Sequence, residues 1–102
     1  MREVYLPSAE TYVFEEDGHL KGFIALKGDL LAALFVVPRF QGKGIGSQLM
    51  ALAKKQRKKL CLTVYLENIK SVAFYKKCGF RIVRQQIDSA TGHAELVMEF
   101  PA

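Results

Sequence analysis

Residues 37–50 read Val-Pro-Arg-Phe-Gln-Gly-Lys-Gly-Ile-Gly-Ser-Gln-Leu-Met, and they are the most informative segment of the chain. An apolar run precedes it, an amphipathic pattern follows it, and three glycines stand at every second position: Gly42, Gly44 and Gly46. The pattern predicts a strand that ends in a glycine-rich turn opening a helix. The first amides of a helix have no internal partner, and the helix dipole adds partial positive charge, so the turn suits an anion. The alternative is an ordinary connection whose glycines serve backbone geometry alone.

Two other glycine-rich phosphate patterns do not fit. The dinucleotide fingerprint requires G-x-G-x-x-G, whereas here the third glycine comes one residue early and Ser47 follows it. The nucleotide-triphosphate loop requires G-x-x-x-x-G-K-[ST], a string that the chain lacks. We therefore expect a phosphate ligand of another class.

Two motifs carry a resemblance to a known family. Residues 41–46 (QGKGIG) match the pattern Q/R-x-x-G-x-G/A, and residues 68–80 (NIKSVAFYKKCGF) match N-x-x-A/S-x-x-F/L-Y-x-x-x-G-F. In this order and spacing they resemble the GCN5-related N-acetyltransferase (GNAT) superfamily, and most of all its small bacterial members. The resemblance covers about residues 11–100.

The resemblance implies an α/β (α+β) fold, namely the acyl-CoA N-acyltransferase fold. In that fold a mixed, mostly antiparallel sheet contains a central parallel β-α-β crossover. It also implies acetyl-CoA as co-substrate, with its pyrophosphate in the glycine turn and its pantetheine arm along the preceding strand. Asn68 would bond that arm. The cofactor-binding residues would be Phe35 and Val37 through their main chain, with Gln41, Gly42, Lys43, Gly44, Ile45, Gly46 and Ser47 in the turn.

Tyr75 is the one catalytic residue that the resemblance assigns, as the general acid facing the CoA sulfur. A thiol with pKa ~8.5 is a fair leaving group, and a phenol with pKa ~10 can return its proton. The alternative is an aromatic residue of the helix face that packs on the sheet. Relatives often carry a glutamate base where this chain has Thr63, and Glu67 stands nearby, but we assign no base.

The family usually begins with a strand and two helices that build the pocket for the acceptor amine. Only ten residues precede Thr11, so we expect an N-terminally shortened domain. The site would then be completed by a partner, be open to a large acceptor, or bind CoA without turnover. The missing strand would leave residues 11–16 as a free edge that can pair in a homodimer.

The length of 102 residues indicates a single domain, residues 1–102, and half of the residues are hydrophobic. No apolar run approaches the ~20 residues of a membrane helix, and no signal peptide is recognisable. Cys61 and Cys78 have no metal spacing with His19 or His93, so we expect reduced thiols, no metal and a cytoplasmic protein. The net charge of +5 suits a polyanionic ligand. The basic run at residues 54–59 is read as the end of a helix, with a nucleic-acid patch as the sharper alternative.

Periodicity predicts strands at residues 11–16, 20–27, 30–37, 60–66, 80–88 and 94–100, and helices at about 44–58 and 68–78. The first helix would bury Ile45, Leu49, Leu52 and Ala53, and Asn68 would cap the second. The leading hypothesis is an N-acetyltransferase that passes an acetyl group from acetyl-CoA to an unidentified primary amine in a ternary complex. A non-catalytic acyl-CoA-binding module is the main alternative, and a basic nucleic-acid-binding domain is the third.

Overall fold

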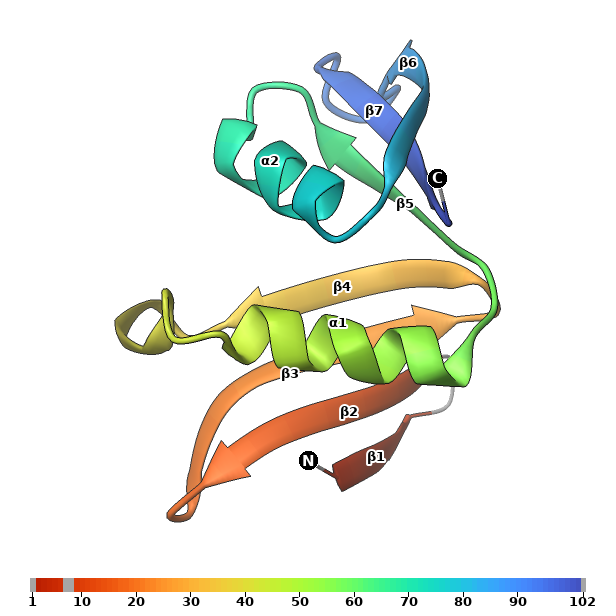
Figure 1. Cartoon of the computed structure of the whole chain (residues 1–102). Coiled ribbons are helices and arrows are strands. Elements are labelled where there is room, and N and C mark those ends of the chain that lie inside the picture. The colour runs from red at the N-terminus through yellow and green to blue at the C-terminus, as the bar shows by residue number, and fades with distance from the viewer. Residues whose placement is uncertain (1, 7–8, 102) are drawn as a thin grey trace. The chain divides into compact units, whose positions relative to one another are not determined.

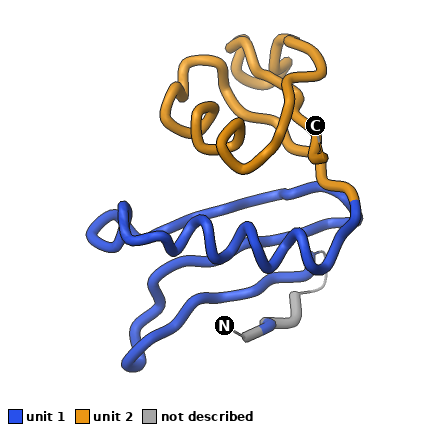
Figure 2. The backbone as a smooth tube through the Cα atoms, viewed as in Figure 1, with its two compact units in different colours: residues 1–58 blue, residues 59–102 orange. Residues whose placement is uncertain are grey.

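The structure, a computed structural model, describes residues 2–6 and 9–101. The chain forms two compact units, residues 1–58 and residues 59–102 (Figure 2). Each unit contributes several strands and one α-helix (Figure 1).

The first unit is a four-stranded antiparallel sheet with one long helix. Strands β1 and β2 pair, then β2 and β3, then β3 and β4. After β4 comes a short 3-10 helix, η1, and then α1. The elements are β1 (Arg2–Leu6), β2 (Ala9–Glu16), β3 (His19–Lys27), β4 (Leu30–Val36), η1 (Pro38–Phe40) and α1 (Ile45–Gln56).

The core of this unit lies between the sheet and α1, which lies over the sheet and runs along β4 in Figure 1. The helix buries residues spaced at i, i+4, i+5 and i+8, the apolar face of an amphipathic helix. Met50 is buried there, whereas Leu52, expected on that face, is half-buried. The buried apolar residues of the unit are Val13, Ile24, Ala25, Leu26, Leu31, Ile45, Leu49, Met50 and Ala53.

The second unit is a three-stranded antiparallel sheet with the order β5-β7-β6 and one helix. Its elements are β5 (Leu60–Tyr65), α2 (Ile69–Lys77), β6 (Arg81–Ile87) and β7 (Ala94–Phe100). Strands β5 and β7 bury alternate residues, as strands with one covered face do. Its buried apolar residues are Leu60, Leu62, Val64, Phe80, Leu96 and Met98.

The predicted free edge at residues 11–16 is wrong. Strand β1 pairs with β2 along five residues, from Arg2 opposite Val13 to Leu6 opposite Ala9. A strand needs far fewer residues than a helical hairpin, so the residues before Thr11 suffice for β1. The other predicted strands agree with the structure to within about two residues at each end.

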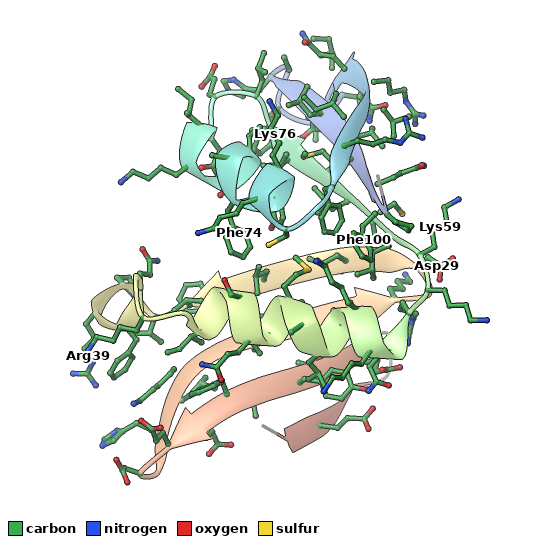
Figure 3. The ribbon with its side chains drawn as sticks, viewed as in Figure 1. Asp29, Arg39, Lys59, Phe74, Lys76 and Phe100 are labelled. Carbon is green, nitrogen blue, oxygen red and sulfur yellow. The ribbon has the colours of Figure 1, made fainter. Side chains whose placement is uncertain are left out.

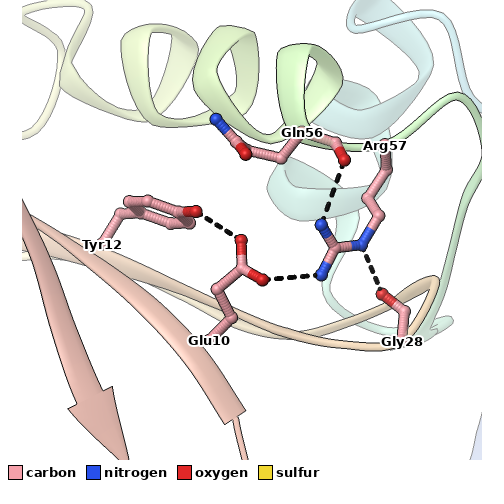
Figure 4. A network of polar contacts seen from close by, with 5 residues as sticks. All are labelled: Glu10, Tyr12, Gly28, Gln56 and Arg57. Carbon is pink, nitrogen blue, oxygen red and sulfur yellow. Dashed lines mark hydrogen bonds and ion pairs between the residues drawn. The ribbon is translucent and has the colours of Figure 1, made fainter.

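The first helix ends earlier than its sequence pattern indicates. It stops at Gln56 because Arg57 is extended, with φ −139° and ψ 137°. The Arg57 side chain turns back over the unit, donating from Nε to the Gly28 carbonyl at 2.8 Å and from Nη2 to Glu10 at 3.0 Å (Figure 4). Glu10 also accepts a hydrogen bond from the hydroxyl of Tyr12. The end of α1 is thus tied to β2 and to the β3–β4 turn.

Candidate functional site

The glycine turn between β4 and α1 is an open loop in which two glycines adopt the left-handed conformation. Gly42 has φ 78° and Gly44 has φ 82°, a region that other residues seldom enter. A Cβ built on either glycine meets no heavy atom within 4 Å. Backbone conformation therefore requires glycine at both positions, and the space beside them is open.

The N-terminus of α1 presents unpaired amides next to this turn. The first bond of the helix runs from the Gln48 amide to the Gly44 carbonyl, at 3.0 Å. The amides of Ile45, Gly46 and Ser47 precede that bond and have no partner one turn back. The first turn of the helix has neither an acidic residue nor a side-chain cap. These amides and the helix dipole favour an anion.

Gln41 fixes the start of the turn to the end of β4. Its side-chain Nε2 donates to the Val36 carbonyl at 3.1 Å, and its main-chain amide donates to the Pro38 carbonyl at 3.2 Å. The residue that opens the first motif thus holds the loop in position.

The expected main-chain role of Phe35 and Val37 is contradicted by the strand register. The Val37 amide donates to the Lys21 carbonyl of β3 at 2.8 Å, and its carbonyl accepts from Phe40 at 2.8 Å. Antiparallel pairs alternate between bonded and non-bonded, so Phe35, which lies opposite Phe23, also directs its groups to β3. The main-chain groups that point away from β3 belong to Leu34 and Val36. The sequence of β4 is apolar throughout, so it does not indicate which of its residues hydrogen-bond to β3.

Two basic residues that the motifs did not indicate lie beside the turn, together with Lys43. Arg39 extends from η1, in the loop after β4 (Figure 3), and Lys21 comes from β3. All three direct their cations at the ring of Phe40, at 4.7 Å for Lys21, 4.9 Å for Arg39 and 6.0 Å for Lys43. No sequence motif joins Lys21 to this cluster, because strand pairing alone brings it there.

In the second unit, Tyr75 is half-buried on α2 between two aromatic rings. Its ring centroid lies 5.5 Å from that of Phe74 and 5.8 Å from that of Phe80, both nearly edge-on. Burial, and to a smaller extent Cys78, raises the pKa of the Tyr75 phenol. The phenol is thus protonated at neutral pH, as a proton donor must be. The same shift increases the free energy needed to pass that proton to a thiolate.

Asn68 stands at the N-cap of α2, but its side chain makes no capping hydrogen bond, so that part of the prediction is wrong. The main chain of Asn68 makes the hydrogen bonds at the start of the helix: its amide donates to the Tyr65 carbonyl and its carbonyl accepts from the Val72 amide, both at 3.0 Å. The exposed side-chain amide is not used by the first turn of the helix. Its bond to pantetheine stays a prediction.

Beyond the end of β5, polar side chains join the strand to the β6–β7 hairpin. The Tyr65 hydroxyl donates to Asp88 at 2.6 Å, and the Glu67 carboxylate lies 3.6 Å from Nδ1 of His93. Thr63, where relatives often have a glutamate, is an exposed residue of β5 opposite Val97. Sequence reasoning noted Glu67 but missed its pairing, which depends on the conformation of the hairpin.

Three further properties concern the described residues only. Within residues 2–6 and 9–101, no three His, Cys, Asp or Glu side chains are grouped so that they could hold a metal ion. No helix in those ranges is long and apolar enough to cross a membrane. Cys61 and Cys78 form no disulfide in that part of the chain.

Known proteins with similar sequences are acetyltransferases. A family model described as an acetyltransferase (GNAT) domain matches residues 7–82. The peptidyl-lysine N-acetyltransferase YiaC of Escherichia coli K12 is 37% identical over an alignment of 102 residues, and the match covers 99% of this chain and 70% of YiaC. The peptidyl-lysine N-acetyltransferase YjaB of Salmonella typhimurium LT2 is 36% identical over an alignment of 86 residues, and the match covers 82% of this chain and 59% of YjaB.

Solved structures share the fold. The apo form of E. coli YjaB superposes with a TM-score of 0.80 at 30% identity, over 92% of this chain and 66% of YjaB. A GNAT family acetyltransferase of Elizabethkingia anophelis, solved with acetyl-CoA bound, gives a TM-score of 0.83 at 21% identity, over 93% of this chain and 77% of that one. The predicted fold class is thereby confirmed. The chain belongs to the GNAT family of acetyltransferases, the enzymes that transfer an acetyl group from acetyl-CoA to an amine.

Proposed function

We propose that this protein is a lysine N-acetyltransferase, which passes the acetyl group of acetyl-CoA to the ε-amine of a lysine in a peptide or protein. The observation that carries the donor side is the open glycine turn before the unpaired amides of α1. The acceptor class rests on the similarity to YiaC, which is named as a peptidyl-lysine N-acetyltransferase.

On the donor side, we assign the pyrophosphate of acetyl-CoA to the amides of Ile45, Gly46 and Ser47. Lys43 would add charge, and Gly42 and Gly44 would let the phosphates approach the backbone. Gln41 would act indirectly, by holding the turn on Val36. The pantetheine arm would bond to main-chain groups of Leu34 and Val36, which point away from β3. The Asn68 side chain stays a predicted pantetheine ligand on the strength of its motif.

The reaction needs a neutral amine, an aligned thioester and a proton for the leaving group. The lysine nitrogen attacks the thioester carbon, the new C–N bond forms, and the C–S bond breaks as the tetrahedral intermediate collapses. Tyr75 gives its hydroxyl proton to the departing sulfur, the nitrogen loses a proton to solvent, and the Tyr75 phenolate regains a proton from solvent before the next turnover. The phenol of Tyr75 holds its proton at neutral pH, so a proton is in place when charge develops on sulfur, and the raised pKa sets the free energy that the transfer must supply.

A pair of peptides tests this function. One carries a single lysine and a blocked N-terminus, the other a free N-terminus and no lysine. With acetyl-CoA, we expect thiol release and one added acetyl group, by mass spectrometry, on the lysine peptide only. Acetylation of the second peptide alone would overturn the acceptor assignment. Tight acetyl-CoA binding without thiol release from a panel of amines would favour the non-catalytic acyl-CoA-binding module.

We include the cytoplasm in the proposal because the two cysteines form no disulfide within the described residues, which suits a reducing compartment. A homodimer formed by pairing at residues 11–16 is not included, since β1 occupies that edge of β2.

A further inference from the structure

Three positively charged side chains gather around the ring of Phe40. Lys21, Arg39 and Lys43 each place a cation within 6.0 Å of its centroid. Glu16 pairs with Lys21 at 2.5 Å, so among these four charged side chains the balance remains positive. Like charges held close together repel one another, and an anion placed among them removes that cost. The cluster is therefore better suited to a bound anion than to the free chain.

Lys21 is the fixed member of the cluster. Its carbonyl accepts the Val37 amide at 2.8 Å, which sets its place beside the end of β4, and its side chain is only 16% exposed. Arg39 and Lys43 are exposed and lie on either side of Phe40 and Gln41 in the sequence. The cluster thus joins the rigid sheet to the loop that leads into the glycine turn.

Acetyl-CoA carries three phosphate groups, and the turn accounts for two of them. Backbone amides at the start of a helix suit the pyrophosphate, whose non-bridging oxygens accept hydrogen bonds from N–H groups. The third phosphate is a monoester on the 3′ carbon of the ribose, with a charge near −2 at neutral pH, as for other phosphate monoesters. Such a group is best matched by several converging cations, and arginine can bind it with two hydrogen bonds.

We propose that Lys21, Arg39 and Lys43, gathered on Phe40, bind the 3′-phosphate of acetyl-CoA and so select it over acetyl-3′-dephospho-CoA. This assignment depends on the proposed function, in that acetyl-CoA is taken as the donor. Phe40 keeps the three cations in place through its ring face. Lys43 also adds charge beside the pyrophosphate, whereas Lys21 and Arg39 make the adenosine end a determinant of donor choice.

The test compares the dissociation constants of the two donors by calorimetry in 0.15 M salt, a condition under which exposed charges are partly screened. For the unmodified chain we expect acetyl-CoA to bind about tenfold more tightly than the dephospho form, roughly 1.4 kcal/mol. In Lys21→Met combined with Arg39→Gln, the ratio should fall to about two, with affinity for the dephospho form almost unchanged. Lys55→Met, which removes an exposed cation from the last turn of α1, should keep the full ratio.

Two results would overturn the assignment: equal affinities for the two donors in the unmodified chain, or equal weakening of both in the double variant. The latter would place the cations on the pyrophosphate. Absence of any acetyl-CoA binding would instead refute the proposed function along with this inference. If the double variant does not fold, Arg39→Gln alone changes an exposed side chain and should still reduce the ratio. Glu16→Gln, which releases Lys21 from its carboxylate, should increase it.

Discussion

The side-chain amide of Gln41 donates a hydrogen bond to the main-chain carbonyl of Val36 over 3.1 Å, which fastens the glycine turn to the last residue of β4. Gln41→Leu removes this bond and leaves the turn less well ordered before the donor arrives. Because a hydrogen bond contributes about 1 kcal/mol net, we expect acetyl-CoA to bind about fivefold more weakly. Calorimetry measures this directly. Gln56→Leu, at the opposite end of α1, is the control and should leave the affinity unchanged; equal losses in both variants would refute the role of Gln41.

Alanine substitutions at two glycines with nearly the same backbone conformation distinguish an effect on folding stability from an effect on acetyl-CoA binding. Gly44 has φ 82° and Gly18, in the β2–β3 turn, has φ 75°, and a Cβ on either meets nothing within 4 Å. Alanine at each should cost about 1–2 kcal/mol of folding stability, because L-residues disfavour this region. Only Gly44→Ala should also weaken acetyl-CoA binding. A similar loss of acetyl-CoA affinity in Gly18→Ala would contradict a specific role of Gly44, because the loss would then follow from lower folding stability alone.

Glu10 should make the stability of the first unit sensitive to acid. Hydrogen bonds from Tyr12 and then from Arg57 lower the pKa of its carboxyl below the ordinary 4.5. A lowered pKa in the folded state contributes stability above the unfolded value, and this is lost as pH falls through the folded value. Urea unfolding should show Glu10→Gln to be less stable than the parent at pH 7, with the difference shrinking below about pH 4. A difference that is constant with pH would contradict this.

Tyr12, which donates to Glu10, should make the folding stability of the first unit fall at alkaline pH. Burial, followed by the hydrogen bond to Glu10, raises the pKa of Tyr12 from 10.0 to about 12. Its contribution is therefore complete below pH 10 and disappears as pH rises towards 12. Tyr12→Phe should flatten this limb of the stability profile, whereas Tyr65→Phe should leave most of the loss in place.

In the second unit, the bond from Tyr65 to Asp88 should hold the β6–β7 hairpin closed. Asp88 also accepts from the Ala90 amide at 3.0 Å, and its carbonyl accepts from Gly92 at 2.7 Å. Tyr65→Phe should speed amide hydrogen exchange at Ala90 and Gly92 without changing exchange in α1. Tyr12→Phe is the matched control in the other unit. Unchanged exchange in the hairpin would show that its own turn suffices.

The sequence predicts those features whose backbone conformation or burial is determined by one short segment. Gly42 and Gly44 mark a turn because their backbone region excludes other residues, and the spacing of Ile45, Leu49 and Ala53 marks the buried face of α1. The family was readable for the same reason, since both motifs are local.

The features that were missed depend on pairing between distant segments. The apolar run of β4 has no polar–apolar alternation and so does not define its register on β3, which is why the sequence points to Phe35 and Val37 instead of Leu34 and Val36. Lys21 joins the cluster at Phe40 only through strand pairing. The end of α1 is set by Arg57 reaching Glu10 and Gly28, contacts that no helix propensity contains.

The central claim is that this chain performs acetyl transfer with Tyr75 as proton donor, and Tyr75→Phe tests it most directly. The substitution keeps the ring that packs on Phe74 and Phe80 and removes only the hydroxyl. Steady-state kinetics with acetyl-CoA and a lysine peptide should show kcat reduced about 100-fold, in the range of general acid catalysis, with the acetyl-CoA dissociation constant within twofold of the parent. An unchanged kcat, or a loss of acetyl-CoA binding in proportion to activity, would contradict this role.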